Sequence, residues 1–364
     1  HPLRMEKPLP NDLAKVSRIV YPAGREAIID RLIKPKLKSS TCGEYLHCSI
    51  EDENQLWQGK NILDLDKLNS NEEKFCLIVG GPGDGKSVLL QQLLVSKRDN
   101  EDEVSISLSA RSLTQDAYLN TLSMREGEEK ISHFISLIEK ECLRSNYQLT
   151  WNQSIQRWIS KGFRLNLYID ALDEVRSVAA RDEIFSILFL VSKSLLNVSV
   201  KISMRENILR QTLTNYNREN NDQSLDNMSV HKIEWDESRI INNFIPSLLH
   251  GWNLNFDSHS FKELNLFLKS SKKSLRNRDS EENRIFLKNP LRAVWLVNFV
   301  YDQSIDLKNM RVSTFEDEIL RLSVKNRYET RRLDGLEVPE SILEELLDIL
   351  ASIAVLDYNW DSGC

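Results

Sequence analysis

The chain has 364 residues, of which 41% are hydrophobic and 28% charged, and its formal net charge at pH 7 is -6. The length exceeds that of one ordinary domain and the composition is that of a globular protein, so we expect about two or three compact units. Because no apolar run approaches the ~18 residues of a membrane span, we expect no membrane partner. The negative net charge argues against nucleic acid as a direct partner.

Cysteine usage bears on compartment and on metal binding. The five cysteines are widely spread and form no C-x-x-C pair, which favours a reducing compartment, so we predict a cytoplasmic location. Cys42, His47 and Cys48 lie close together, but a structural zinc site needs four ligands and no second pair follows, which disfavours a metal there. The chain begins with His1 rather than Met, and we expect it to be a fragment of a longer protein.

The N-terminal stretch has few signs of regular structure. It shows no sustained apolar periodicity and contains five prolines, at Pro2, Pro8, Pro10, Pro22 and Pro35. We therefore expect residues 1–73 to be an approach or linker segment.

From residue 74 onward, short apolar strands alternate with helical stretches. The predicted strands are Phe75–Val79, Val104–Ser109, Phe163–Ile169, Val198–Ser203 and Val230–Trp235. Strands separated by helices indicate a parallel sheet that is covered on both faces. Residues 74–235 are thus predicted to form an α/β domain.

After Asp236 the strand signals stop and the pattern becomes helical. Apolar residues recur every three or four positions in stretches such as ESRIINNFIPSLL and PLRAVWLVNFVY, which predicts an all-α region. Asn289 is a suitable N-cap for a helix that starts at Pro290, and Ser313 with Glu316 fits a capping box. We predict a helical domain over residues 236–310.

The stretch GGPGDGKS, from Gly80 to Ser87, matches the phosphate-binding motif G-x-x-x-x-G-K-[ST] and lies between a predicted strand and a predicted helix. Glycines let backbone N–H groups approach phosphate oxygens, and the following helix adds the positive end of its dipole. Lys86 is a predicted catalytic residue and Ser87 a predicted Mg²⁺ ligand. The ligands we predict are ATP or ADP with Mg²⁺, and the predicted contacts from this stretch are Gly80, Gly81, Pro82, Gly83, Asp84, Gly85, Lys86, Ser87 and Val88.

A second, acidic group follows the strand in LNLYIDALDEV. Asp170 ends that strand, as a metal-binding aspartate does in a Mg²⁺–nucleotide site, and is our second predicted Mg²⁺ ligand. Asp173 and Glu174 are predicted catalytic residues, because one carboxylate can bind metal while another orients the attacking water. Arg205, just past a later apolar strand, is either a γ-phosphate sensor or a surface arginine.

These motifs resemble the NACHT-type STAND NTPases, nucleotide-operated signalling switches that include animal inflammasome receptors and bacterial antiphage defence proteins. D-A-L-D-E, from Asp170 to Glu174, resembles the family's variant of the Walker-B motif, in which a small residue follows the metal-binding aspartate. ISMREN resembles the arginine-bearing sensor strand, and FLKNPLRAVWLV resembles the segment whose proline packs against the nucleotide, here Pro290. STFEDEILRLSV resembles the start of a winged-helix domain, which we predict over residues 311–364.

The resemblance implies an ATP- and Mg²⁺-binding switch with slow hydrolysis that self-associates and activates a fused effector, in innate immune or antiphage defence. The residues alone indicate only Mg²⁺–nucleotide binding. One departure is that family members commonly hold the β-phosphate of ADP with a winged-helix histidine, whereas the last histidine here, His259, precedes that domain. An AAA+-like remodelling motor and a scaffold with a structural nucleotide are the alternatives, and the trigger and effector stay open.

Overall fold

The chain divides into two compact units, one formed by His1–Leu254 with Leu287–Val294 and the other by Asn255–Phe286 with Trp295–Cys364. The computed structural model describes only residues of the first unit, namely 35–51, 60–62, 68, 73–96, 103–114, 126–144, 155–160, 162–220, 225, 227–247, 289–291 and 293–294. Most of the predicted helical domain, the helix start at Ser313 and the predicted winged-helix domain lie outside the described residues.

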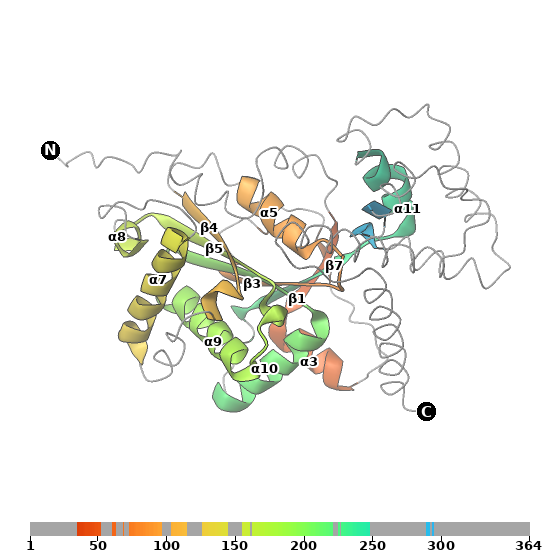
Figure 1. Ribbon diagram of the computed structural model, residues 1–364. Helices are drawn as coiled ribbons and strands as arrows, with labels where there is room; N and C mark the ends of the chain where they lie inside the picture. Colours follow the sequence, from red (N-terminus) through yellow and green to blue (C-terminus); the bar gives the residue numbers. More distant parts are fainter. Residues whose placement is uncertain are drawn as a thin grey trace, which may run out of the picture. The chain divides into compact units, whose positions relative to one another are not determined.

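A seven-stranded sheet of order β2-β1-β7-β3-β6-β5-β4 forms the centre of the first unit (Figure 1). The strands from β7 to β4 are parallel to one another, while β1 is antiparallel to both β7 and β2. All five predicted strands and the parallel sheet are therefore confirmed. The strands are β1 (Lys36–Thr41), β2 (Lys60–Ile62), β3 (Phe75–Val79), β4 (Glu103–Ser109), β5 (Arg164–Asp170), β6 (Val198–Met204) and β7 (Ser229–Glu234).

The two central strands are buried, β3 with continuous apolar sequence and β6 with apolar residues that alternate with Ser199, Lys201 and Ser203. Every residue of β3 and every residue of β6 is buried. Buried parallel strands need apolar side chains on both faces, because helices cover both faces of such a sheet. Strand β3, which precedes the glycine-rich loop, and strand β5, which ends at Asp170, both pair with β6.

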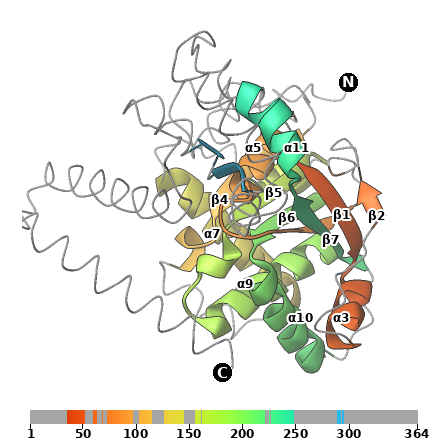
Figure 2. The same cartoon turned by 90° about the vertical axis from the view of Figure 1, so that its right-hand side faces the viewer.

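The N-terminal segment contributes to the sheet domain, where we expected a linker. β1 pairs with β7 along its whole length, from Lys36 opposite Glu234 to Thr41 opposite Ser229, and β2 forms the edge beyond it (Figure 2). Leu37 is the one buried side chain in β1. The strand is held by backbone hydrogen bonds rather than by an apolar face, which is why hydrophobic periodicity did not predict it.

Helices cover both faces of the sheet (Figure 1). On one face, α5 (Lys86–Ser96) packs its buried leucines, among them Leu89 and Leu93, against Ile78 and Tyr168 of the strands. The opposite face and its flank carry α3 (Cys42–Glu51), α7 (Gly127–Arg144), α8 (Ile155–Ser160), α9 (Val178–Ser194) and α10 (Glu206–Asn220). Among the described residues, no helix combines the length and the apolar character that crossing a membrane requires.

Short helical turns complete the described unit. They are η1 (Ser112–Thr114) after β4, η2 (Leu172–Glu174) after β5, and α11 (Glu237–Arg239) with the π-helical turn η4 (Ile240–Phe244) after β7. Trp235 packs edge-on against Phe244, with ring centroids 5.4 Å apart. This contact fixes the chain as it leaves the sheet beside the glycine-rich loop.

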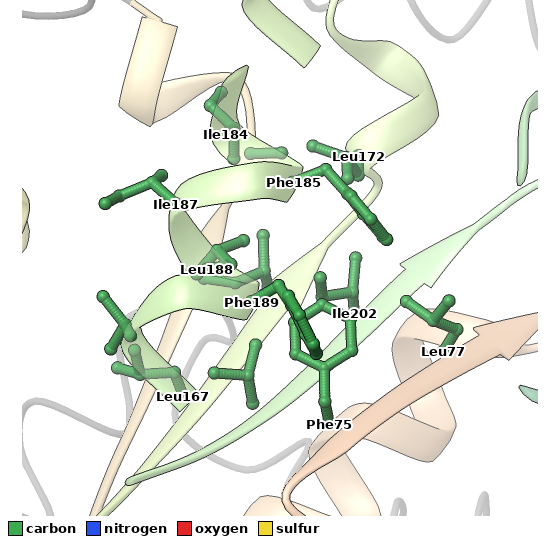
Figure 3. Close-up of a cluster of buried hydrophobic side chains, with 14 of the residues drawn as sticks. Phe75, Leu77, Leu167, Leu172, Ile184, Phe185, Ile187, Leu188, Phe189 and Ile202 are labelled. Atoms are coloured by element: carbon green, nitrogen blue, oxygen red, sulfur yellow. The ribbon is translucent and has the colours of Figure 1, made fainter. Parts of the chain in front are cut away.

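An aromatic cluster joins helices α9 and α10 to strand β3 of the sheet. Phe75 of β3 meets Phe185 and Phe189 of α9 edge-to-face, with centroid separations of 5.5 and 5.3 Å, and both α9 rings also contact Tyr216 of α10. Figure 3 shows the α9 phenylalanines beside Phe75 within a shell of aliphatic side chains. Edge-to-face pairs add to the burial of ring area, so this cluster should contribute strongly to stability.

We expect Phe185→Ala to lower the free energy of unfolding by about 3–5 kcal/mol, because it leaves a ring-sized cavity in this cluster. Urea unfolding followed by circular dichroism measures the change. Leu196→Ala is the matched control, since Leu196 is 83% exposed and its truncation should cost about 0.5 kcal/mol or less. Equal losses in the two variants would contradict the assignment of the core.

Candidate phosphate-binding site

The glycine-rich loop connects the end of β3 at Val79 to the start of α5 at Lys86, as predicted. Gly83 and Gly85 have φ angles of 82° and 87°, a region that favours glycine. At Gly83 space is limiting as well, because an added Cβ would come within 2.7 Å of Asn289 Oδ1. Glycine is therefore favoured at both positions by the backbone angle, and at Gly83 also by the lack of space beside Asn289.

Asp84 holds the loop in shape. Its carboxylate accepts a hydrogen bond from the Gly81 N–H at 2.5 Å, and its carbonyl accepts one from the Trp235 indole at 2.9 Å. Burial raises the pKa of Asp84, against the lowering effects of the Gly81 hydrogen bond and the Lys86 charge. The carboxylate is thus turned toward the loop's own backbone.

Lys86 lies over the same loop. Its Nζ donates to the carbonyl oxygens of Gly80 at 3.0 Å and Gly81 at 2.8 Å, which uses two of the three ammonium donors. Burial lowers the pKa of Lys86, and the nearby carboxylates of Asp173 and Asp84 counteract this effect. A partly desolvated ammonium interacts more strongly with an anion than one in bulk water.

Three oxygen-bearing side chains converge at the edge of the sheet where β3, β5 and β6 end. Ser87 Oγ donates to Asp170 Oδ1 at 3.0 Å, and Ser203 Oγ donates to the same oxygen at 2.5 Å. Mg²⁺ takes oxygen ligands at about 2.0–2.1 Å in octahedral geometry, which places neighbouring ligands about 3 Å apart. The Ser87–Asp170 separation and its all-oxygen donor set therefore fit Mg²⁺.

The turn after β5 brings two more carboxylates to this edge. Ala171 has φ 56° and is the non-glycine residue with positive φ among those described. Its N–H donates to Ser203 Oγ at 2.8 Å, so the serine fixes both Asp170 and the turn that follows. A β-branched or bulky residue rarely adopts the left-handed conformation, so this turn disfavours such residues directly after Asp170.

Both predicted catalytic carboxylates form ion pairs with arginine. Arg205 Nε lies 2.9 Å from Asp173 Oδ2, and Arg111 Nε lies 3.0 Å from Glu174 Oε2. The Asp173 side chain is only 6% exposed, and its Oδ1 is buried without a hydrogen-bond partner among the described residues. A buried carboxylate oxygen of this kind fits a site that receives a polar ligand or water.

The segment around Pro290 contacts the loop directly. Asn289 Oδ1 accepts a hydrogen bond from the Leu291 N–H at 3.0 Å, so Asn289 caps the helical turn that begins at Pro290, as predicted. Asn289 Nδ2 donates to the Pro82 carbonyl at 2.8 Å, and the Leu291 N–H also lies 3.3 Å from the Gly83 carbonyl. Pro290 itself is buried. Residues 289–291 therefore contact the backbone of the loop.

Replacing Asn289 tests that contact. We expect Asn289→Ala to cost about 1 kcal/mol of stability from the lost cap, and to raise hydrogen exchange of the loop amides from residue 81 to 85. Asn289→Ser is the control, because serine caps a helix about as well but is too short to reach the Pro82 carbonyl. Faster loop exchange in both variants with unchanged stability in the serine variant would support the contact, whereas unchanged exchange in both would contradict it.

The predicted site residues meet in one region, with Val88 half-buried in the first turn of α5 and Arg205 directly after β6. Sequence reasoning missed three contributors, namely Ser203, Arg111 and Trp235. Ser203 does not stand out in the sequence, because β6 also contains Ser199 and Lys201. The sequence contains no signal for Arg111 either.

Comparisons with known proteins find distant likenesses among solved structures. No protein-family model and no curated protein matches the chain. Among solved structures, it is similar to the Walker-type ATPase PABY2304 of Pyrococcus abyssi, with 14% identity and a TM-score of 0.40 over 80% of this chain and 89% of that one. It is also similar to PCH-2 of C. elegans, with 12% identity and a TM-score of 0.34 over 78% of this chain and 73% of that one.

Such distant likenesses say nothing about activity. The loop sequence, its position between β3 and α5, and the Ser87–Asp170 contact instead match the phosphate-binding loop motif in both sequence and structural context.

Proposed function

We propose that this chain is an ATP- and Mg²⁺-binding switch of the NACHT-type STAND kind, with slow hydrolysis that regulates self-association and a fused effector. Support for the family comes from the resemblance of D-A-L-D-E, ISMREN and the Asn289–Pro290 segment. Support for Mg²⁺–nucleotide binding comes from the loop, Lys86, and the oxygen pair of Ser87 and Asp170.

The observation that carries the switch is the ion pair between Arg205 and Asp173. A guanidinium bound to a carboxylate can exchange that partner for a phosphate, because both anions suit its planar donors. A γ-phosphate would compete with Asp173 for Arg205, while ADP would leave the pair intact. The two nucleotides would therefore favour different local arrangements, which is the differential affinity that a switch requires.

The residues of the chain have distinct roles in this proposal. Backbone N–H groups of the loop and Lys86 bind the phosphates, and Ser87 and Asp170 would hold Mg²⁺, which supplies positive charge against the phosphate oxygens. Glu174 or Asp173 would accept the proton of the attacking water. Because Asp173 and Glu174 are both paired with arginine, hydrolysis would wait for these pairs to rearrange.

The affinity ratio of ATP to ADP tests the exchange of partners. We expect Asp173→Asn to raise the affinity for a non-hydrolysable ATP analogue relative to ADP by roughly tenfold, since a hydrogen bond to a charged group contributes about 1.5–3 kcal/mol. Arg205→Ala should lower the affinity for the ATP analogue relative to ADP. Isothermal titration with both ligands gives the ratios, and unchanged ratios in both variants would refute the exchange.

Turnover separates the proposal from its alternatives. A motor hydrolyses ATP continuously, a scaffold not at all, and a regulatory switch well below the median enzyme rate of about 10 per second. Light scattering with ADP and with the ATP analogue tests self-association. Pro290→Ala should loosen ADP binding and increase spontaneous self-association, because Pro290 is buried in the segment that contacts the loop.

A further inference from the structure

A cluster of three metal-ligating side chains lies at the opposite end of β3 from the phosphate-binding loop. Glu73 lies two positions before Phe75, where β3 begins, Cys76 is the second residue of β3, and His231 comes from β7, which pairs with β3 in parallel. Cys76 pairs with Ser229, two residues before His231. Because side chains alternate along a strand, Cys76, Ser229 and His231 share the face of the sheet that α5 covers.

The ligand atoms converge on one point. His231 Nε2 lies 2.7 Å and Cys76 Sγ 3.5 Å from Glu73 Oε2, and the three groups offer donor atoms that all lie within 4.8 Å of one another. Cys76 and His231 are completely buried, whereas the Glu73 side chain is 30% exposed. The cluster is therefore buried at Cys76 and His231 and reaches solvent at Glu73.

We propose that Glu73, Cys76 and His231 form a zinc-binding site, with water as the fourth ligand. Zinc bonds to sulfur at about 2.3 Å, to nitrogen at about 2.0–2.1 Å and to carboxylate oxygen at about 2.0–2.2 Å, so tetrahedral ligand atoms lie roughly 3.3–3.6 Å apart. The Cys76–Glu73 distance already fits. The His231–Glu73 distance must widen by about 0.6 Å, which the partly exposed glutamate can provide by moving outward.

The surroundings of the histidine support this assignment. Ser39 Oγ of β1 lies 2.6 Å from His231 Nδ1, on the ring nitrogen that faces away from Cys76 and Glu73. Ligand histidines are usually oriented by a hydrogen bond to their second nitrogen. Ser229 Oγ, 3.0 Å from both His231 Nε2 and Glu73 Oε2, can hydrogen-bond the water ligand.

The chemistry of the cluster separates it from the Mg²⁺ site. A thiolate and an imidazole suit zinc, whereas Mg²⁺ takes oxygen ligands and is predicted at Ser87 and Asp170 beyond the other end of β3. A bound zinc would link β3 to β7 and, through Ser39, to the antiparallel strand β1. It would thereby strengthen a part of the sheet that apolar packing supports weakly, since β1 has one buried side chain.

Metal content of the purified chain tests the proposal. After dialysis against metal-free buffer and addition of one equivalent of zinc, we expect close to one zinc per chain by mass spectrometry of the metal. Cobalt substituted for zinc should give thiolate-to-cobalt charge-transfer absorption and the intense visible bands of a tetrahedral site. Cys76→Ser and His231→Gln should lose both signals, while Cys42→Ser, which removes the other described buried cysteine, should keep them.

Affinity measurements keep the proposal testable if a ligand variant fails to fold. Ser39→Ala changes no ligand, and we expect it to weaken zinc binding roughly 10- to 100-fold in competition with a chromophoric chelator. Glu73→Gln, at a partly exposed position, should also weaken binding. Absence of zinc from the wild-type chain, cobalt spectra without a thiolate band, or wild-type affinity in both Ser39→Ala and Glu73→Gln would each overturn the site.

Discussion

Replacing Lys86 with alanine is expected to weaken ATP binding by roughly 30- to 5,000-fold, the equivalent of about 2–5 kcal/mol for removing one partner of a buried charge pair. Lys86 Nζ lies over the loop at 2.8 and 3.0 Å from the carbonyls of Gly81 and Gly80. In the proposed function, Lys86 is the lysine that binds the phosphates. Its alanine variant also removes a positive neighbour of Asp84 and Asp173, so the anionic groups left behind repel the phosphates.

Fluorescence titration with a labelled ATP analogue measures the loss, and urea unfolding checks that the fold is retained. Lys193→Ala is the matched control, because it removes an exposed lysine from the last turn of α9. We expect that control to bind ATP with wild-type affinity. Wild-type affinity in Lys86→Ala would show that the loop does not hold phosphate and would remove the basis of the proposed function.

The central strand β3 could be predicted because burial on both faces favours continuous apolar sequence, as FCLIV shows. The loop could be predicted because Gly83 and Gly85 adopt backbone angles that other residues rarely reach. In both cases a local requirement of the backbone or the core limits which residues fit. Such requirements are visible in a single sequence.

The order of the strands and the contacts between distant side chains cannot be predicted from a single sequence in this way. Ser203 reaches Asp170 only because β6 lies between β3 and β5, and the sequence does not state that order. Arg111 reaches Glu174 from the turn after β4, over 63 positions of the chain. β1 was missed because backbone bonds to β7 hold it, and any residue can form those.

The two acidic positions at the end of β5 should separate metal binding from catalysis. Asp170→Ala removes the oxygen that Ser87 and Ser203 both contact, so we expect ATP affinity to become nearly independent of Mg²⁺. Titrations with Mg²⁺ and with a chelator give this dependence. Wild-type dependence in Asp170→Ala would exclude Asp170 as a metal ligand.

Glu174→Gln should behave in the opposite way, leaving ATP and Mg²⁺ binding intact while slowing hydrolysis by about 10²- to 10⁴-fold, the range for loss of a general base. Glutamine keeps the shape of the side chain, and the Arg111 ion pair that it breaks is exposed on both sides, so little stability should be lost. Single-turnover hydrolysis at saturating ATP measures the chemical step apart from binding. Normal hydrolysis in Glu174→Gln would move the role of base to Asp173, whose Oδ1 is buried and whose Oδ2 pairs with Arg205. Normal hydrolysis in Asp173→Asn as well would mean that neither carboxylate is the base, and the catalytic prediction would be wrong.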